Sequence, residues 1–401
     1  MLTATANLYK NAYAGLSRRM WLLATVMLIN RSGTMVLPFM TLYCKHIGYS
    51  TQQGGWVVAI YGTGALVGAF IGGRLSDRLG FYYMQFSSLF CGGILFIVLG
   101  QMNTYLSICI CTFFLSMFNE SFRPANSTAI AHYSTPENRT QSFSIARLAI
   151  NVGWGIGAGL GGLLAAINYH LLFWADGCTN ILASISLLWF LPRVTLAQQK
   201  QTAIRSSIVA KAVSAYKDKM FLYFIVLQLF FAICFFQLFT TVPLFFKEGL
   251  LMNEAQIGFT MALNGIIIAI LEMIIVFKFE GRAPYLRLMT IGSVIMSISF
   301  FMLNMPLSNG FLVAIFATII VTFAEMIAMP FMNTWYISRS TEGNRGQYAA
   351  LYTMAWSAAQ VIGSSSGTQV AHGLGFTNLW WIIGGICLVN AVGYSLLKNK
   401  E

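Results

Sequence analysis

The stretch 79–119 decides the class of fold, and it reads LGFYYMQFSSLFCGGILFIVLGQMNTYLSICICTFFLSMFN. It contains no Asp, Glu, Lys or Arg, and it is long enough for two bilayer crossings, since one crossing needs about 20 apolar residues. The whole chain is 57% hydrophobic and 9% charged, whereas soluble domains carry about 25% charged residues. The sequence therefore predicts an all-α membrane protein. Four further stretches lack these charged residues: 148–175, 220–246, 288–324 and 346–397.

Twelve membrane-spanning helices are expected. Lys45 and Lys247 then fall on one side of the membrane. Arg31, Arg123 and Arg147 fall within spans, so the other 19 of the 24 basic residues lie on the second side. Since Lys and Arg accumulate on the cytoplasmic side, both termini are expected there. A basic face beside anionic lipid explains the net charge of +12 without a nucleic-acid partner. The predicted spans are 20–44, 53–74, 82–101, 104–131, 142–167, 169–191, 221–247, 253–279, 284–304, 308–337, 346–372 and 376–397.

No pattern in the sequence indicates an enzyme, a cofactor or a metal site. The seven cysteines and four histidines form no cluster with metal-ligand spacing. The phosphate-binding pattern GxxxxGK[ST] is absent, which argues against an ATP-driven pump. An intramembrane enzyme would need a catalytic dyad at one depth, and the sequence shows none. We therefore expect a non-enzymatic membrane protein without cofactors.

An internal repeat relates two parts of the chain. When the sequence is shifted by 206 positions, Pro124 aligns with Pro330, and the run NRTQ at 138–141 aligns with NRGQ at 344–347. The joint register of a proline and a loop tetrapeptide favours an internal duplication. The same shift pairs Gly157 with Gly363 and Gly161 with Gly367, and it brings Glu120 to the neighbour of Glu325.

The repeat and the charge pattern together predict the domain organisation. The longest polar segment is 193–219, and it lies between the two repeated parts. We expect a six-helix bundle at 1–192, a cytoplasmic connector at 193–219 and a second six-helix bundle at 220–401.

The loop between the second and third predicted helices reads Gly73-Arg74-Leu75-Ser76-Asp77-Arg78-Leu79-Gly80. This run resembles the loop signature of the major facilitator superfamily, G-x-L-[D/S/A]-D-R-x-G-R-[R/K], although Phe81-Tyr82-Tyr83 replaces the basic pair that usually follows. The resemblance implies two six-helix halves related by a pseudo-twofold axis, and transport by alternating access. It also implies a gate at Gly73, Asp77, Arg78 and Gly80, with Asp77 facing the start of helix eleven near Gln347. Glu137 and Arg139 are expected to extend this gate into a charge network.

Two further segments resemble bacterial drug:proton antiporters of that superfamily. They are INRSGTMVLPF at 29–39 and NESFRPA at 119–125. The glycines from 153 to 162 resemble the glycine-rich antiporter motif, although Ala158 stands where its proline is usual. The resemblance implies a monomer in a bacterial cytoplasmic (inner) membrane that exports small amphiphilic or drug-like molecules in exchange for protons. The alternative is a proton-coupled symporter of a nutrient such as a short peptide, which shares the fold.

Three arginines and three glutamates lie well inside the predicted spans. Ionised groups at membrane depth are costly and usually face a bundle interior or a watery cavity, so these residues are candidates for proton coupling or substrate binding. Glu120 and Arg123 are three residues apart on one helical face, and Arg31 is expected at their depth. These three form either a functional ion cluster or a static bridge. The six residues are Arg31, Glu120, Arg123, Arg147, Glu272 and Glu325.

Glu325 has no basic residue within two helical turns, so we expect an unpaired carboxylate that carries a proton, or one that is simply protonated and hydrogen-bonded. Arg147 and Glu272 are expected about 8 Å and about 10 Å from the inner ends of helices five and eight. The resemblance packs these two helices together. Arg147 and Glu272 therefore either bridge the halves or pair within their own halves.

Residues of helix seven are expected to line a substrate cavity together with Asn30 of helix one. The resemblance implies that helices one, four, seven and ten surround the central cavity. An apolar wall with few polar groups suits an amphiphilic molecule, although contact with lipid is the alternative for the phenylalanines. The helix-seven candidates are Gln228, Phe235, Phe236 and Gln237.

Overall fold

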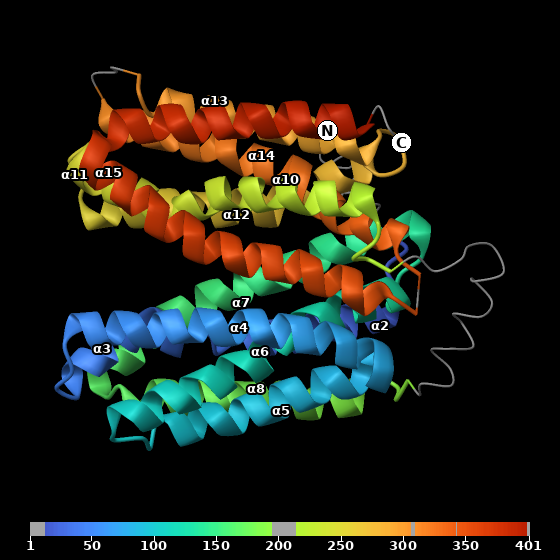
Figure 1. Ribbon diagram of the computed structural model, residues 1–401, viewed down its shortest axis with the longest axis vertical. Helices are drawn as coiled ribbons and strands as arrows, with labels where there is room; N and C mark the ends of the chain where they lie inside the picture. The colour runs from blue at the N-terminus through green and yellow to red at the C-terminus, as the bar shows by residue number, and fades with distance from the viewer. Residues whose placement is uncertain (1–12, 195–213, 306–308, 342, 399–401) are drawn as a thin grey trace.

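The computed structural model describes residues 13–194, 214–305, 309–341 and 343–398. These residues form helices and the turns between them (Figure 1). The helices are α2 (Arg18–Ser32), α3 (Val36–His46), α4 (Thr51–Leu79), α5 (Phe81–Leu99), α6 (Tyr105–Tyr133), η1 (Pro136–Asn138), α7 (Arg139–Ile167), α8 (His170–Phe190), α10 (Lys219–Phe236), η2 (Gln237–Phe239), α11 (Thr241–Glu248), α12 (Glu254–Phe279), α13 (Tyr285–Met302), α14 (Gly310–Arg339) and α15 (Arg345–Lys398).

Ten helices of the described chain are long and apolar enough to cross a membrane, which agrees with the predicted class of fold. This number is smaller than the twelve predicted spans for two reasons. The span predicted at 20–44 is broken into α2 and α3, and neither piece is long enough alone. The spans predicted at 346–372 and 376–397 run together as α15, which bends at Gly375. Gly375 has φ of 83°, a left-handed conformation that glycine adopts without a steric penalty.

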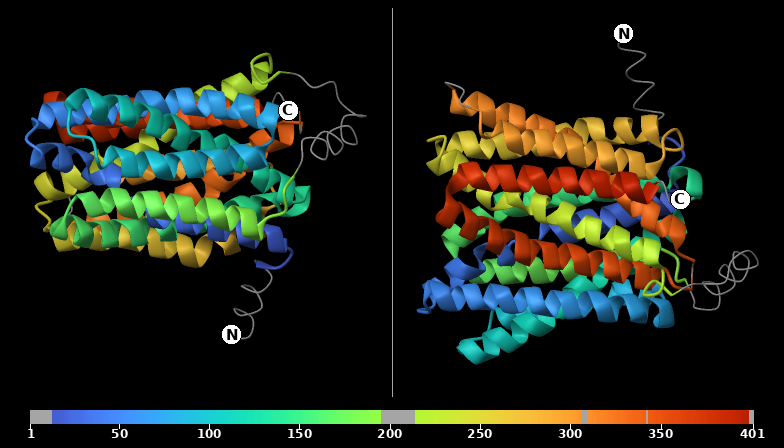
Figure 2. Two further views of the ribbon diagram at one scale, coloured as in Figure 1. Left: turned by 90° about the horizontal axis from the view of Figure 1, so that it is seen from below. Right: turned by 45° about the horizontal axis from the view of Figure 1, so that its top comes forward.

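The helices fall into two groups that are distinguished by colour in Figure 1. The helices α2–α8 form an N-terminal group, and α10–α15 form a C-terminal group. The right-hand view of Figure 2 shows the same order from another direction. One face of the molecule joins the groups, and we call it the connector face. It is defined by the ends of α4 at Leu79 and α12 at Phe279 and by the beginnings of α7 at Arg139 and α15 at Arg345.

Local structure repeats with the spacing of 206 residues found in the sequence. The side chain of Asn138 accepts a hydrogen bond from the backbone N–H of Thr135 (2.8 Å). The side chain of Asn344 accepts the same bond from Thr341 (2.8 Å). Each bond fixes the turn before a long helix, α7 in one group and α15 in the other. The repeat thus appears in folded geometry as well as in residue identity.

The first helix of each group is broken at an equivalent place. The chain leaves helical geometry at 33–35, between α2 and α3, and it changes to the short 3-10 helix η2 at Gln237–Phe239, between α10 and α11. Asp176 of α8 stabilises the first break, because its carboxylate accepts the backbone N–H groups of Met35 and Val36, each at 2.9 Å. These N–H groups begin α3 and have no partner within it, so Asp176 has a structural role.

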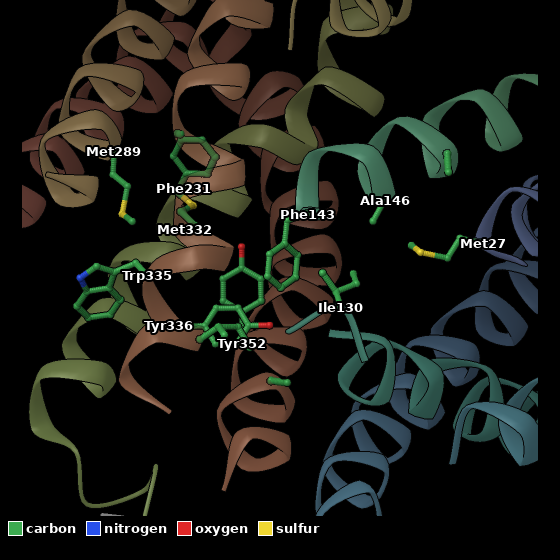
Figure 3. Close-up of a cluster of buried hydrophobic side chains, with 14 of the residues drawn as sticks. Met27, Ile130, Phe143, Ala146, Phe231, Met289, Met332, Trp335, Tyr336 and Tyr352 are labelled. Carbon is green, nitrogen blue, oxygen red and sulfur yellow. The ribbon is translucent and has the colours of Figure 1, made fainter. Parts of the chain in front are cut away.

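A large apolar cluster crosses from one group to the other near the connector face. Figure 3 shows Phe143 of α7 pointing toward the aromatic side chains of α14 and α15. Among these, Tyr336 and Tyr352 stack with ring centroids 4.5 Å apart. Their burial holds the two groups together next to the charged residues described below.

Asp218 links three helices of the C-terminal group at the connector face. It caps α10 through the N–H of Phe221, and it forms two 3.0 Å bonds with the guanidinium of Arg339 on α14. It also accepts the hydroxyl of Tyr348 on α15 (2.9 Å). Burial alone would raise the pKa of Asp218, but the hydrogen bonds from Arg339, Phe221 and Tyr348 lower it below its ordinary value of 3.8.

We expect Asp218→Asn to destabilise the fold by about 1–3 kcal/mol at pH 7, because a charged acceptor of several hydrogen bonds is lost. Since the pKa is lowered, the contribution is present above pH 3.8 and is lost as the pH falls through the folded value. Thermal unfolding midpoints in detergent should therefore differ between variant and wild type at pH 7 and converge as the pH falls below 3.8. The control is Glu248→Gln, which changes an exposed carboxylate. Equal midpoints at pH 7 would refute the role of Asp218.

Candidate functional site

Arg147 of α7 lies between two carboxylates of the C-terminal group. Its Nη1 donates to Glu272 Oε2 of α12 (2.7 Å), and its Nη2 donates to Glu325 Oε2 of α14 (2.5 Å). The side chains are almost enclosed, with exposed fractions of 14% for Arg147 and 3% for each glutamate. The predicted contact between Arg147 and Glu272 is thus present in the structure.

The expectation that Glu325 is unpaired is wrong. Its partner Arg147 lies 178 positions away and comes from the other helix group, so the neighbours of Glu325 on its own helix gave no sign of it. Asn264 of α12 also donates to Glu325 and to the hydroxyl of Thr322, which orients the carboxylate. Asn264 was missed because a single amide in an apolar span carries no pattern of its own.

The composition of this site favours the uptake of a proton. When both glutamates are ionised, two negative charges face one guanidinium, and the site has a surplus of one negative charge. A charged side chain at the centre of a membrane helix costs about 2.5–3.5 kcal/mol on insertion scales, and pairing must offset that cost. One proton on either glutamate neutralises the site. The same three side chains join α7 to α12 and α14.

The depth of the site follows from its place on the helices. Arg147 lies eight residues after the beginning of α7 at Arg139, which is about 12 Å of helix. Glu272 lies seven residues before the end of α12 at Phe279, which is about 10 Å. The helix α7 begins three residues earlier than the sequence predicted, so Arg147 is deeper than expected and still meets Glu272.

Asp77 of α4 joins the two groups at the connector face. Its carboxylate accepts the backbone N–H groups of Gly346 (2.8 Å) and Gln347 (3.0 Å) at the beginning of α15. The predicted contact with the start of this helix is confirmed. Gly73, one turn earlier on α4, permits the approach, since a Cβ there would lie 2.3 Å from the Cβ of Ala350. A carboxylate at a helix N-terminus gains about 0.3–1 kcal/mol, and up to ∼2 when partly buried.

Glu280 makes the corresponding contact from the C-terminal group to the N-terminal group, and it was not predicted from the sequence. It follows the last residue of α12 and accepts the backbone N–H of Thr140 (2.7 Å) at the beginning of α7. Thr140 aligns with Gly346 under the shift of 206 residues. Each helix group therefore supplies a carboxylate that caps a helix of the other group. The repeat was a signal that could have located Glu280 opposite Asp77.

The remaining gate residues have smaller roles in the structure. Gly80 ends α4 with φ of 95°, which turns the chain toward α5. Arg78 and Glu137 are exposed, so they lie on the surface of the connector face and outside its buried contacts. Of the predicted charge network, Glu137 lies near enough to Arg139 to be attracted to it, and Arg139 is also attracted to Glu280.

A second charged cluster lies within the N-terminal group. Glu120 and Arg123 of α6 form an ion pair, with Arg123 Nε 3.1 Å from Glu120 Oε2. Arg31 of α2 is near enough to be attracted to Glu120 and repelled by Arg123, but its side chain forms no ion pair or hydrogen bond with any described residue. The predicted cluster therefore exists, although Arg31 stands outside its ion pair.

Three predicted cavity residues lie inside the helix packing instead. Asn30 is 4% exposed and donates to Asn180 (2.8 Å), which ties α2 to α8. Gln237 is fully buried and donates to the carbonyl oxygen of Gly363 (2.9 Å). Gln228 is also fully buried. The amides of Asn30 and Gln237 bind neighbouring helices, whereas the buried amide of Gln228 has no hydrogen-bond partner among the described residues. A polar residue that binds a neighbouring helix cannot be distinguished from one that lines a cavity by sequence alone.

The two predicted phenylalanines are only partly buried. Phe235 and Phe236 contact Trp356 of α15, with ring centroids 5.4 and 5.7 Å apart. Phe235 also contacts Phe239 (5.4 Å), which in turn contacts Trp154 of α7 (6.5 Å). We call these five side chains the aromatic cluster. It joins the two groups farther from the connector face than Arg147 does.

Comparison with known proteins identifies the family. The sequence profile of the Major Facilitator Superfamily matches residues 20–364. The chain belongs to the Major Facilitator Superfamily. Its members are transporters and not enzymes, so this chain is a multi-pass membrane transporter.

Several members of the superfamily resemble this chain along most of its length. The Na⁺, Li⁺, K⁺/H⁺ antiporter of Planococcus maritimus is 23% identical, over 91% of this chain and 92% of its own. Multidrug resistance protein 2 of Bacillus subtilis (strain 168) is 20% identical, over 83% of each chain. The crystal structure of the human organic anion transporter MFSD10 (TETRAN) superposes with a TM-score of 0.75 at 13% identity, covering 94% of this chain and 99% of its own. At that identity the superposition establishes a common fold.

The two carboxylate caps lead to a prediction about the connector face. Asp77→Asn and Glu280→Gln should each open this face, because each removes the charge at a helix N-terminus of the other group. A loss of 0.3–2 kcal/mol corresponds to roughly a 2- to 30-fold change in the open population. The measurement is the maleimide labelling rate of Ala350→Cys, a position that is 1% exposed.

The matched control is Glu137→Gln, which removes an exposed carboxylate from the same face. It should label at the rate of the parent protein, and the double variant Asp77→Asn/Glu280→Gln should label faster than either single variant. Equal labelling of Asp77→Asn and Glu137→Gln would show that the caps do not hold the face closed.

Proposed function

We propose that this chain is a proton-coupled secondary transporter of small organic molecules that works by alternating access. The observation that carries the proposal is the guanidinium of Arg147 between Glu272 and Glu325. This site accepts a proton, and it also joins helices of the two groups. A proton that binds one of these carboxylates weakens its contact with Arg147, and this contact holds the two groups together.

The proposal includes the architecture expected from the sequence. The pieces α2 and α3 make one broken span and α15 makes two, which gives twelve spans in two six-helix halves. The halves are residues 1–192 and 220–401, and 193–219 connects them. The repeated caps at Asn138 and Asn344 and the reciprocal contacts of Asp77 and Glu280 support this pseudo-twofold arrangement.

The cellular setting is proposed on the same basis. A protein with bacterial relatives and a strongly basic connector face fits the cytoplasmic membrane of a bacterium, with the connector face and both termini in the cytoplasm. No described residue depends on a second copy of the chain for its position, and a monomer is sufficient for alternating access.

The cycle begins with the connector face closed. Asp77 and Glu280 hold it at the surface, and Arg147 holds it at depth. A proton that binds Glu272 or Glu325 removes one of the two charges that retain Arg147. The two groups then separate at the connector face, and the proton leaves on that side. The direction that fits the antiporter and multidrug resistance relatives is export of the organic molecule against entry of protons.

Glu325→Gln should abolish pH-gradient-driven accumulation in proteoliposomes while retaining exchange of the same molecule without a gradient. The glutamine cannot take up a proton, but it keeps the size of the side chain and can still bind Asn264. Fluorescent amphiphiles of either charge serve as probes. Glu248→Gln is the control, since it changes an exposed carboxylate. Gradient-driven accumulation that persists in Glu325→Gln would exclude Glu325 from coupling.

A charge exchange tests whether Arg147 and Glu272 act as a pair. Arg147→Glu and Glu272→Arg should each abolish gradient-driven transport, because each leaves like charges facing one another at depth. The double variant keeps one guanidinium and two carboxylates in the site, so it should regain at least a tenth of the parent rate. A double variant as inactive as both single variants, yet folded by size-exclusion chromatography, would show that the pair does not couple as a unit.

A further inference from the structure

The cluster of Arg31, Glu120 and Arg123 has a surplus of one positive charge. The helices packed around it add no charge at this depth. The stretches 52–73 of α4 and 346–397 of α15 contain no charged residue, and Asp176 of α8 is bonded to the backbone of α3. Glu272 and Glu325 are bound to Arg147 of α7, about 9 Å farther along that helix. None of these carboxylates forms an ion pair with Arg31 or Arg123.

Neither arginine of the cluster is fully buried. The side chain of Arg123 is 39% exposed, and Arg31 is partly exposed. At about 100° per residue, Arg123 lies about 140° around α6 from Phe118, which lines an apolar groove of α4, α5 and α6. Arg123 therefore faces away from that groove. Its helix also packs against α15 of the other group.

A neutral donor lies beside the arginines. The hydroxyl of Tyr61 on α4 accepts a hydrogen bond from the amide of Asn119 (3.1 Å), so its own proton remains to be donated. Tyr61 interacts electrostatically with Arg31 and with Glu120, which places it in the same cluster. The site thus offers two guanidinium groups and one hydroxyl, and the one carboxylate among them, Glu120, is bound by Nε of Arg123. Guanidinium groups bind carboxylates with two parallel hydrogen bonds.

The cluster lies close to the proton-accepting site and to the aromatic cluster. A Cβ at Gly153 of α7 would be 2.7 Å from the Cβ of Arg31. Gly153 is six residues from Arg147, so Arg31 lies about 9 Å farther along α7 from the connector face. The next residue after Gly153 is Trp154, which belongs to the aromatic cluster. An anionic group at the arginines would place its apolar part near aromatic side chains.

We propose that Arg31 and Arg123 bind the carboxylate of an amphiphilic aromatic anion, with the hydroxyl of Tyr61 as a third donor. The inference rests on the proposed transport function and names the class of substrate. The surplus of one positive charge matches a singly charged carboxylate better than a doubly charged phosphate. The anion and the proton occupy separate sites about 9 Å apart on α7, so either can bind without displacing the other.

The test measures binding to the purified protein by calorimetry, without a pH gradient. The probes are 2-naphthoate, neutral 2-naphthamide, 2-naphthylmethylammonium and 2-naphthyl phosphate. We expect 2-naphthoate to bind at least ten times more tightly than the other three. Arg31→Gln and Arg123→Gln should each weaken 2-naphthoate at least tenfold and leave 2-naphthamide unchanged. Arg287→Gln, which changes an exposed arginine of α13, should have no effect.

Glu120→Gln tests the proposal by a gain of binding, which a misfolded variant would not show. It increases the positive surplus, so it should strengthen the binding of 2-naphthoate. Arg31→Lys should bind more tightly than Arg31→Gln. The proposal is overturned if 2-naphthoate fails to bind, if the amide, ammonium or phosphate binds as tightly, or if the arginine variants bind it normally. Glu325→Gln distinguishes this proposal from the proposed coupling. The variant should still bind 2-naphthoate while it loses gradient-driven transport.

Discussion

The rest of the structure depends on one guanidinium that two buried carboxylates share. Arg147 comes from the N-terminal group, and Glu272 and Glu325 come from the C-terminal group. In a membrane, none of these charges is stable without its partners, so the helices that carry them must meet. Phe143 and the stacked tyrosines belong to one buried apolar cluster that includes residues of both groups (Figure 3). A contact of this kind opposes separation of the groups only while the charges persist.

At the connector face, carboxylates again join the two groups, and here their partners are backbone N–H groups. A helix N-terminus has N–H groups without partners in its own helix, and here Asp77 and Glu280 satisfy them from the opposite group. The strength of each contact is modest, so the face can open and close without breaking either group. Within the groups, Asp176 and Asp218 satisfy helix ends in the same way, and these contacts have no reason to break during a cycle.

The sequence predicted the class of fold and the contact of Asp77, because these depend on composition and a loop motif. It missed the break between α2 and α3 and placed the end of α4 five residues early. It predicted that Arg147 and Glu272 lie at one depth, which follows from helix rise alone. It failed for Glu325, whose partner belongs to a distant segment, and for Asn30 and Gln237, whose amides bind neighbouring helices. Side-chain partners between helices depend on rotation and tilt, and apolar spans of this length contain little information about either. The contact of Glu280 could have been predicted, because the repeat of 206 residues aligns its partner Thr140 with the residue that Asp77 caps.

Distances across the connector face, measured against pH, show directly whether the Arg147 site controls closure. Spin labels at Glu137 and Ser338, both exposed and on opposite groups, report the distance by pulsed electron resonance in nanodiscs, in a background without native cysteines. If a proton on Glu272 or Glu325 weakens the contact with Arg147, the short-distance population should fall as the pH is lowered. The variant Glu272→Gln/Glu325→Gln should give one distribution at every pH. A wild-type distribution that does not change with pH, or an equal pH response in that variant, would contradict control of closure by Arg147 and its two carboxylates.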